Sequence, residues 1–242
     1  MTDDNLSDDP DLDAGVFSAW MIEVQAALGG ERASDVPCDG CTACCTSSQF
    51  IHIAPDEADA LAHIPVELLF PAPRFPPGHV LLGYDHRGHC PMLIDNRCSI
   101  YPHRPRTCRT YDCRVFAAAG LDNDDDKIQI TRQARRWRFS YPTPADRAEQ
   151  DGVRAAARYL TGHRDQLSES VTPRDATQLA VLAIEMHGLF LGRDGQTGEL
   201  AVGHPDPEVV RVELTRRRGR DGSAAAAAVA ESNPGATTIP GR

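Results

Sequence analysis

The chain has 242 residues, of which 35 are acidic and 25 are lysine or arginine, giving a formal net charge of −10. This length fits one large domain, or one compact domain with tails. Hydrophobic residues make up 41% and charged residues 25% of the chain, a balance that excludes collagen-like, coiled-coil and wholly disordered classes. The negative charge argues against a general nucleic-acid binder, because phosphate contacts require a basic surface.

Two features predict a cytoplasmic protein with no membrane partner. No apolar run approaches the roughly 20 residues that a membrane-spanning helix needs. Residues 1–13 contain six aspartates, where a secretory signal would carry basic and then apolar residues. We therefore expect residues 1–13 to form a disordered acidic leader. The sequence indicates no particular protein partner.

The first predicted element is a helix that Asp13 caps and that Gly29-Gly30 ends. A short strand over 50–53 and a short helix from Pro55 to about Ile64 follow, and then a surface connection over 65–77. The expected core face of the first helix consists of Val16, Phe17, Trp20, Met21, Val24, Ala27 and Leu28.

Further along, short strands are expected over 79–84 and 92–94, with a turn at Asp95-Asn96. One helix is expected from about Pro105 or Arg109 to Ala119, because Gly120 is suited to end it. Residues 128–139 alternate weakly between apolar and polar side chains, which indicates another strand.

Two further helices have the same start signal. Thr143-Pro144 with Asp146, and Thr172-Pro173 with Asp175, each combine a capping hydroxyl, a proline at the first helical position and a carboxylate at the third. The apolar face of the second helix is expected to consist of Leu179, Leu182, Met186, Leu189 and Phe190.

These elements predict an α+β fold with an irregular cysteine-rich, metal-organised core, in which short strands pack against N-terminal and C-terminal helices. We expect a single domain over 14–215, with a cysteine-rich metal-binding region over about 36–116 and a helical part over about 143–192. Residues 216–242 lack an apolar face, so a disordered tail is expected there.

All eight cysteines lie in one third of the chain. Two intervening residues let a chain turn so that both sulfurs point at one ion, as in zinc ribbons and iron–sulfur ligand loops. Adjacent side chains point in different directions, so Cys44 and Cys45 are not expected to share one tetrahedral ion. One of the two would then face a second metal, bridge two metal ions, or only pack in the interior. The candidate metal ligands are Cys38, Cys41, Cys44, Cys45, Cys90, Cys98, Cys108 and Cys113.

A disulfide framework is the main alternative, because the number of cysteines is even. A chain of this length without a secretory signal does not need such links, and the cytosol keeps thiols reduced. We therefore favour metal ligation, with a buried unligated thiol as the alternative at Cys45 or Cys113.

Cys108 and Cys113 are about 140° apart around a continuous helix, so both face one ion only if Cys108 precedes the helix. Nearby arginines would stabilise thiolates. Among these arginines, we expect Arg104 and Arg109 near the sulfurs, and Arg106 and Arg114 in solvent.

The run Cys38-x2-Cys41-x2-Cys44-Cys45 is followed by Cys90-Pro91-Met92-Leu93, Cys98-Ser99-Ile100-Tyr101, Arg104-Pro105, Cys108-Arg109 and Cys113. This pattern resembles the CxxCxxCC, or YkgJ-like, cysteine-cluster family, whose domain is regarded as zinc- or iron-chelating. The resemblance covers about residues 36–116 and includes all eight cysteines. It implies that these cysteines chelate zinc or an iron–sulfur cluster.

Two functions remain open. In the first, the metal is structural or the protein is an accessory metal-binding module, which the all-cysteine ligands and the lack of a separate acid–base motif favour. In the second, the protein is an iron–sulfur redox enzyme or electron carrier, which the ferredoxin-like spacing of the first three cysteines favours. The arginines around Trp137 are expected to form a solvated face, and RNA binding there is a minor alternative.

Overall fold

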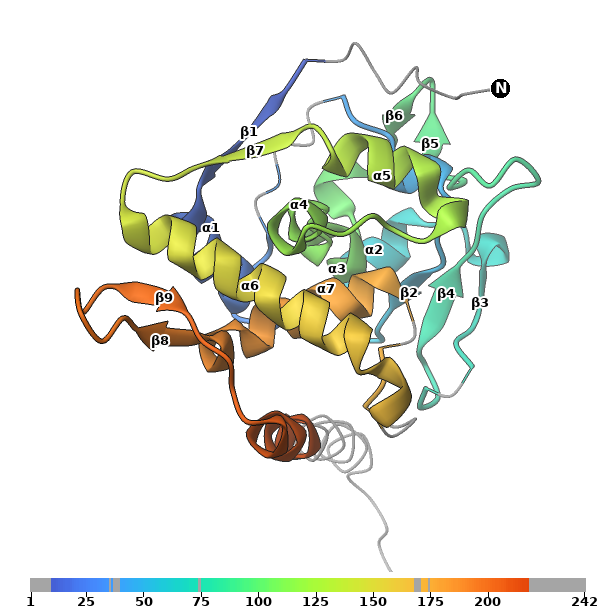
Figure 1. Ribbon diagram of the computed structural model, residues 1–242. Coiled ribbons are helices and arrows are strands. Elements are labelled where there is room, and N and C mark those ends of the chain that lie inside the picture. The colour runs from blue at the N-terminus through green and yellow to red at the C-terminus, as the bar shows by residue number, and fades with distance from the viewer. Residues whose placement is uncertain are drawn as a thin grey trace, which may run out of the picture. The chain divides into compact units, whose positions relative to one another are not determined.

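The computed structural model describes residues 10–34, 36, 40–73, 75–167, 171–173 and 175–217. The chain divides into two compact units, Met1–Gly162 with Pro173–His204, and His163–Thr172 with Pro205–Arg242. Figure 1 shows the labelled elements, which belong to the first unit. The single domain expected over 14–215 stays a prediction.

The first unit combines helices with small sheets, which confirms the α+β class. The helices are α1 (Phe17–Leu28), α2 (Ala58–His63), α3 (Arg106–Thr110), α4 (Arg114–Ala119), α5 (Ile128–Ala134), α6 (Pro144–Gly162) and α7 (Ala176–Met186). The strands are β1 (Leu12–Val16), β2 (Ile51–Ile53), β3 (Leu69–Pro71), β4 (Val80–Leu82), β5 (Leu93–Ile94), β6 (Arg97–Cys98), β7 (Trp137–Ser140), β8 (Leu191–Arg193) and β9 (Leu200–Val202). Short 3-10 turns include η1 (Cys44–Thr46) and η3 (Tyr101–His103).

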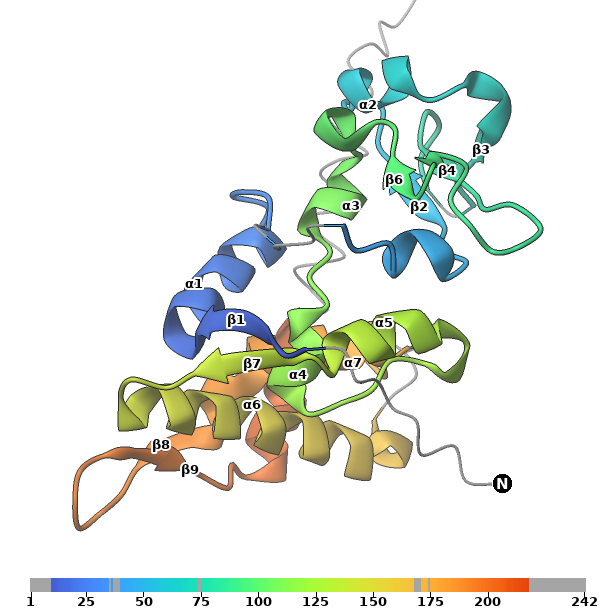
Figure 2. The same cartoon turned by 90° about the horizontal axis from the view of Figure 1, so that it is seen from above.

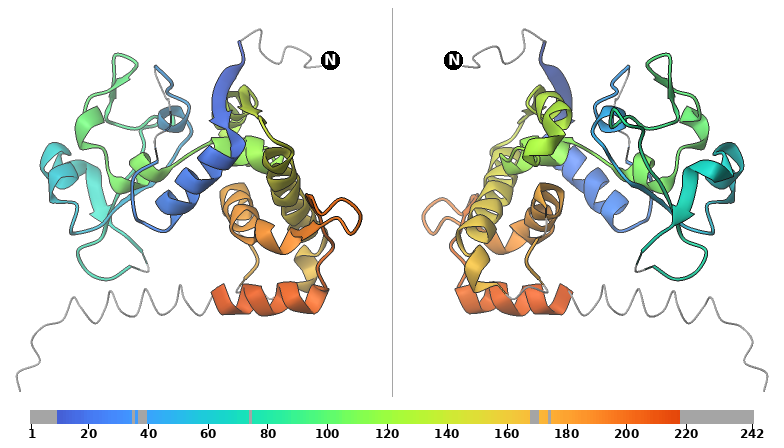
Figure 3. Two further views of the ribbon diagram at one scale, coloured as in Figure 1. Left: turned by 90° about the vertical axis from the view of Figure 1, so that its left-hand side faces the viewer. Right: turned by 90° about the vertical axis from the view of Figure 1, so that its right-hand side faces the viewer.

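The sheets bring distant segments together. β1 pairs in parallel with β7, and β4 pairs antiparallel with both β2 and β3. β5 and β6 form a hairpin whose turn residues, Asp95 and Asn96, both have positive φ, as the sequence predicts. Figure 2 shows α4, α6 and α7 beside the β1–β7 pair, and Figure 3 shows the same elements from two further sides.

Two apolar clusters support this arrangement. The predicted face of α1 is buried at Phe17, Trp20, Met21, Val24 and Ala27, and the rings of Phe17 and Trp20 lie 5.0 and 4.8 Å from the ring of Phe139 in β7. The second cluster lies around the β2–β4–β3 sheet, and Cys90 and Cys98 pack against it. Its buried members are Ile53, Ala60, Ile64, Leu82, Met92 and Ile100.

The start of the first helix differs from the prediction. Asp13 lies in β1, where its carboxylate accepts a hydrogen bond from the Gly15 amide at 2.8 Å, and Gly15 has a φ of 86°. The helix begins after Val16 without a side-chain cap of its own. The Ser18 amide donates instead to Asp146, at the start of α6, over 3.3 Å. The expected leader therefore does not include Leu12 and Asp13, which belong to a paired strand.

Two other predicted elements are wrong in part. The helix expected from about Pro105 or Arg109 to Ala119 is broken between α3 and α4, although Gly120 ends α4 with left-handed backbone, as expected. Residues 128–134 form a helix rather than a strand, with Ile130, Thr131 and Ala134 buried at helical spacing. Of the predicted strand, only residues 137–139 are extended, and they belong to β7.

The later helices follow their start signals. Asp146 accepts hydrogen bonds from the amide and hydroxyl of Thr143 at the start of α6. α7 begins later than predicted, because Asp175 caps it by accepting from the Gln178 amide at 2.8 Å. Of its expected apolar face, Met186 and Phe190 are buried.

Two segments had no predicted structure. β3 lies within the expected surface connection over 65–77, and residues 207–217 of the second unit are helical. That helix includes the first two residues of the expected tail, and residues 218–242 lie outside the described residues. In the part of the chain that the structure describes, no helix is both long and apolar enough to cross a membrane.

Candidate metal centre

The described cysteines fall into two groups, and no disulfide joins any two of them. Group A consists of Cys45, Cys90, Cys98 and Cys108. The first three interact electrostatically with the Cys108 thiol, and Cys98 interacts in the same way with Cys90. Group B consists of Cys41, Cys44 and Cys113, which line one small cavity. Cys38 lies outside the described residues.

Backbone hydrogen bonds assemble group A from three parts of the chain. The Cys90 amide donates to the Cys45 carbonyl at 2.7 Å, which joins η1 to the segment before β5. The Leu93 amide donates to the Cys90 carbonyl at 2.9 Å, and Leu93 pairs with Cys98 in the β5–β6 hairpin. Cys108 comes from α3.

Burial and the neighbouring thiols both disfavour the free thiolate form of Cys90 and Cys108. Burial, followed by the charges of Cys90, Cys45 and Cys98, raises the pKa of Cys108 to about 12, against a smaller opposing effect of Arg104. Burial also raises the pKa of Cys90, and Cys98 adds to that shift. A cation placed among these thiols would stabilise their thiolate forms and reverse this trend, since metal-coordinated thiols deprotonate.

The α3 helix that carries Cys108 is fastened to β2. The Thr107 hydroxyl donates to the His52 carbonyl at 2.7 Å. The buried carboxylate of Glu57 accepts from the Ala54 amide at 3.0 Å and from the Arg106 amide. These contacts hold Cys108 at a fixed position relative to the sheet on which Cys90 and Cys98 pack.

Group B surrounds a cavity of about 20 Å³. Tyr111 and Trp137 also line this cavity, and the Trp137 indole N–H donates to the Cys113 sulfur at 3.2 Å. Burial, and then the charge of Cys44, raises the pKa of Tyr111, so its hydroxyl stays neutral. The space is of the size that one water or one small ion occupies.

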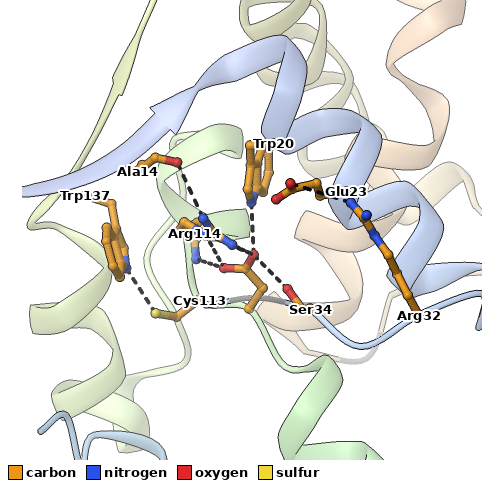
Figure 4. Close-up of polar contacts among 9 residues, drawn as sticks. Ala14, Trp20, Glu23, Arg32, Ser34, Cys113, Arg114 and Trp137 are labelled. Atoms are coloured by element: carbon orange, nitrogen blue, oxygen red, sulfur yellow. Dashed lines mark hydrogen bonds and ion pairs between the residues drawn. The ribbon is translucent and has the colours of Figure 1, made fainter. Parts of the chain in front are cut away.

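The interruption between helices α3 and α4, which positions Cys113, depends on a buried ion pair. Asp112 and Arg114 are 4% and 5% exposed, and a guanidinium nitrogen of Arg114 donates to the Asp112 carboxylate at 2.8 Å. The same carboxylate accepts from the Trp20 indole at 2.9 Å and from the Ser34 hydroxyl at 3.2 Å. Figure 4 shows Trp20, Ser34 and Arg114 converging beside Cys113. This network ties the residue before Cys113 to α1 and to the segment that leads to Cys38.

Cys44 and Cys45 diverge as expected, because Cys44 lines the group B cavity and Cys45 contributes to group A. The sequence leaves open whether Cys108 and Cys113 face one ion. Cys108 lies within α3 rather than before it, and Cys113 follows the break, so the two cysteines belong to different groups.

The arginines were partly mispredicted. Arg114 is buried, because Asp112 two residues earlier pairs with it, whereas the sequence analysis expects it in solvent. Arg109 is exposed instead of lying at the sulfurs. Arg104 and Arg106 are as expected, since Arg104 lowers the pKa of Cys108 and Arg106 is exposed and pairs with Asp56.

One mixed cluster of possible metal ligands escaped the sequence analysis. Asp59 and His63 of α2 and His103 of η3 have ligand atoms within 4.8 Å of one another. The two imidazole rings stack at 3.6 Å, and His103 Nδ1 lies 3.0 Å from the Asp59 carboxylate. The i, i+4 spacing of Asp59 and His63 is visible in the sequence, but only the fold brings His103 to them.

Comparison with known proteins adds one finding. No curated protein and no solved structure matches the chain. Residues 37–134 match the family model described as "CxxCxxCC: Putative zinc- or iron-chelating domain". The matched range contains seven described cysteines together with Cys38 and extends through α5. Residues 37–134 are therefore similar to the CxxCxxCC domain, in agreement with the resemblance that the cysteine pattern indicates.

Proposed function

We propose that this protein binds two zinc ions through closed all-cysteine sites and that the metal is structural or serves an accessory metal-binding role. Group A would hold one ion with its four thiolates. Group B together with Cys38 would hold the other. Four thiolates in tetrahedral geometry are the usual ligand set of structural zinc.

The divergence of Cys44 and Cys45 carries this proposal. One turn, η1, sends adjacent cysteines to two different groups, so the eight cysteines divide into sets of four when Cys38 is assigned to group B. Bound zinc would keep Cys90 and Cys108 in the thiolate form, in surroundings that otherwise raise the pKa of both. Because zinc has no redox chemistry, such sites stabilise a fold rather than transfer electrons. The proposed setting is the cytoplasm, where thiols stay reduced.

An iron–sulfur redox protein is the second candidate. Cysteine thiolates are also the ligands of iron–sulfur clusters, and the family description names iron beside zinc. The Arg104 guanidinium, which lowers the pKa of Cys108, would offset part of the charge of a cluster in group A.

Metal analysis and absorption spectra of the full chain, purified without oxygen, distinguish the two candidates. The proposal predicts a colourless protein with about two zinc ions per chain and little iron. Broad absorbance near roughly 400 nm that bleaches with dithionite, with iron and sulfide in similar amounts, would contradict it and support the redox candidate. A chain that takes up neither metal would contradict both.

A further inference from the structure

Away from the cysteines, the chain has a cavity of about 510 Å³ beside β7 and α6. This volume lies within the range of roughly 300–1,000 Å³ typical of small-molecule sites. Four guanidinium groups and one carboxylate line it, which gives its wall a formal net charge of +3. On a chain whose net charge is −10, this is a local concentration of positive charge.

The two arginines near β7 already have acidic partners. Arg135 hydrogen-bonds to the carboxylate of Asp122 at 2.8 Å, and Arg138 pairs with Asp11 at 2.9 Å. These pairs are exposed, so each contributes little to stability.

The two arginines that α6 contributes to the cavity have no acidic partner among the described residues. Arg147 and Arg154 are seven residues apart, which places them on the same face of the helix two turns apart. No ion pair among the described residues includes either of them. The Nε of Arg154 is buried, and no described group forms a hydrogen bond with it. A buried guanidinium N–H without an acceptor is costly, so the Arg154 side chain would gain by turning this group toward an anion in the cavity.

The remaining wall is apolar and firmly held. Phe116 and Trp137 line the cavity but are 0% and 4% exposed, so the accessible aromatic surface comes mainly from Tyr141. The Arg147 guanidinium lies 3.5 Å from the centre of the Tyr141 ring. The Tyr141 hydroxyl donates to Gln150, whose amide donates to the Ala117 carbonyl at 3.2 Å. The site therefore combines anion-binding groups with aromatic surface, and the cavity is larger than a phosphate group alone requires.

We propose that this cavity binds a small organic phosphate of mononucleotide size, with Arg147 and Arg154 contacting the phosphate and Tyr141 contacting the organic part. Guanidinium groups match phosphate oxygens through paired N–H donors. This site is independent of the proposed zinc sites, although Trp137 lines both this cavity and that of group B.

Isothermal titration of the full chain with ADP tests the proposal, with adenosine and pyrophosphate as comparison ligands. We expect ADP to bind more tightly than either. Arg147→Gln and Arg154→Gln should each weaken ADP binding at least about tenfold, the effect of losing one charge-assisted contact. Arg158→Gln, which removes a charge from the next turn of α6 outside the cavity lining, should change it less than about twofold.

The proposal would be overturned if ADP did not bind, or if Arg147→Gln and Arg158→Gln lost the same affinity. It would also be overturned if adenosine or pyrophosphate bound as tightly as ADP. Tighter binding of a single-stranded RNA oligonucleotide with the same arginine dependence would overturn it in favour of a nucleic-acid surface. Arg147 is exposed, so Arg147→Gln keeps the test valid if Arg154→Gln fails to fold.

Discussion

The amide of Cys90 donates a hydrogen bond to the carbonyl of Cys45 over 2.7 Å. Through this bond the CxxCxxCC run reaches the β5–β6 hairpin that carries Cys98. Because the bond is made by the backbone, it does not require a metal. We infer that much of group A is organised before metal binding and that the metal then stabilises an existing arrangement.

Removal of metal should still destabilise the protein, because the thiolates of each group would lose their common cation. For a chain of this size, about 3 kcal/mol of lost stability lowers the melting temperature by roughly 6–12 °C. We expect a shift of at least that size when a zinc chelator is added in thermal denaturation followed by circular dichroism. Readdition of zinc should restore the original temperature, and an unchanged melting temperature after verified metal loss would refute a structural role.

Loss of the Asp112 carboxylate should be severely destabilising. Asp112→Ala leaves Arg114 buried without its partner and removes the acceptor of the Trp20 indole, which corresponds to roughly 3–5 kcal/mol. The matched control is Asp122→Ala, which breaks an exposed pair with Arg135 and should cost less than about 1 kcal/mol. Urea unfolding measures the loss of unfolding free energy in both variants. Similar losses in the two variants would show that the buried network contributes little to stability.

Acid stability should depend on Asp146. Hydrogen bonds from Ser18, and then from Thr143, lower the pKa of Asp146 from 3.8 to about 2 in the folded protein. This carboxylate therefore stabilises the fold above its unfolded-state pKa, and its contribution of about 2 kcal/mol disappears as the pH falls from about 5 to 2. Asp146→Asn should be less stable at neutral pH and lose less stability over that interval. Parallel pH profiles for the two proteins would contradict this assignment.

Truncations of the N-terminus should separate the acidic leader from β1. Deletion of residues 1–9 should change the melting temperature little, because these residues carry few apolar side chains. Deletion of residues 1–13 also removes the pairing of Leu12 with Trp137 and the ion pair of Asp11 with Arg138, so it should lower the melting temperature clearly. If the two deletions changed the melting temperature equally, β1 would contribute little to stability.

Local signals allowed part of the fold to be predicted. The apolar spacing of α1, the Thr143 and Asp146 start of α6 and the Gly120 end of α4 depend on neighbouring residues, and each was found. The break between α3 and α4 was missed because it depends on the burial of Arg114 with Asp112 and on contacts from Trp20. The parallel pairing of β1 with β7 joins segments more than 100 residues apart and has no local signature.

The candidate site shows the same limit. Spacing alone predicts that Cys44 and Cys45 diverge. Which other cysteines each of them approaches depends on the interruption between α3 and α4, because Cys108 lies before it and Cys113 lies after it. The meeting of His103 with Asp59 and His63 likewise depends on tertiary structure.

Native mass spectrometry of the full chain is the most direct test of two separate cysteine sites. The unmodified protein should carry two zinc ions, and Cys44→Ser and Cys45→Ser should each retain one, since these adjacent residues belong to different groups. Thr46→Ser, a conservative change in the same turn, should retain both. Loss of all metal from either single cysteine variant, or retention of two ions by both, would contradict the division into two sites.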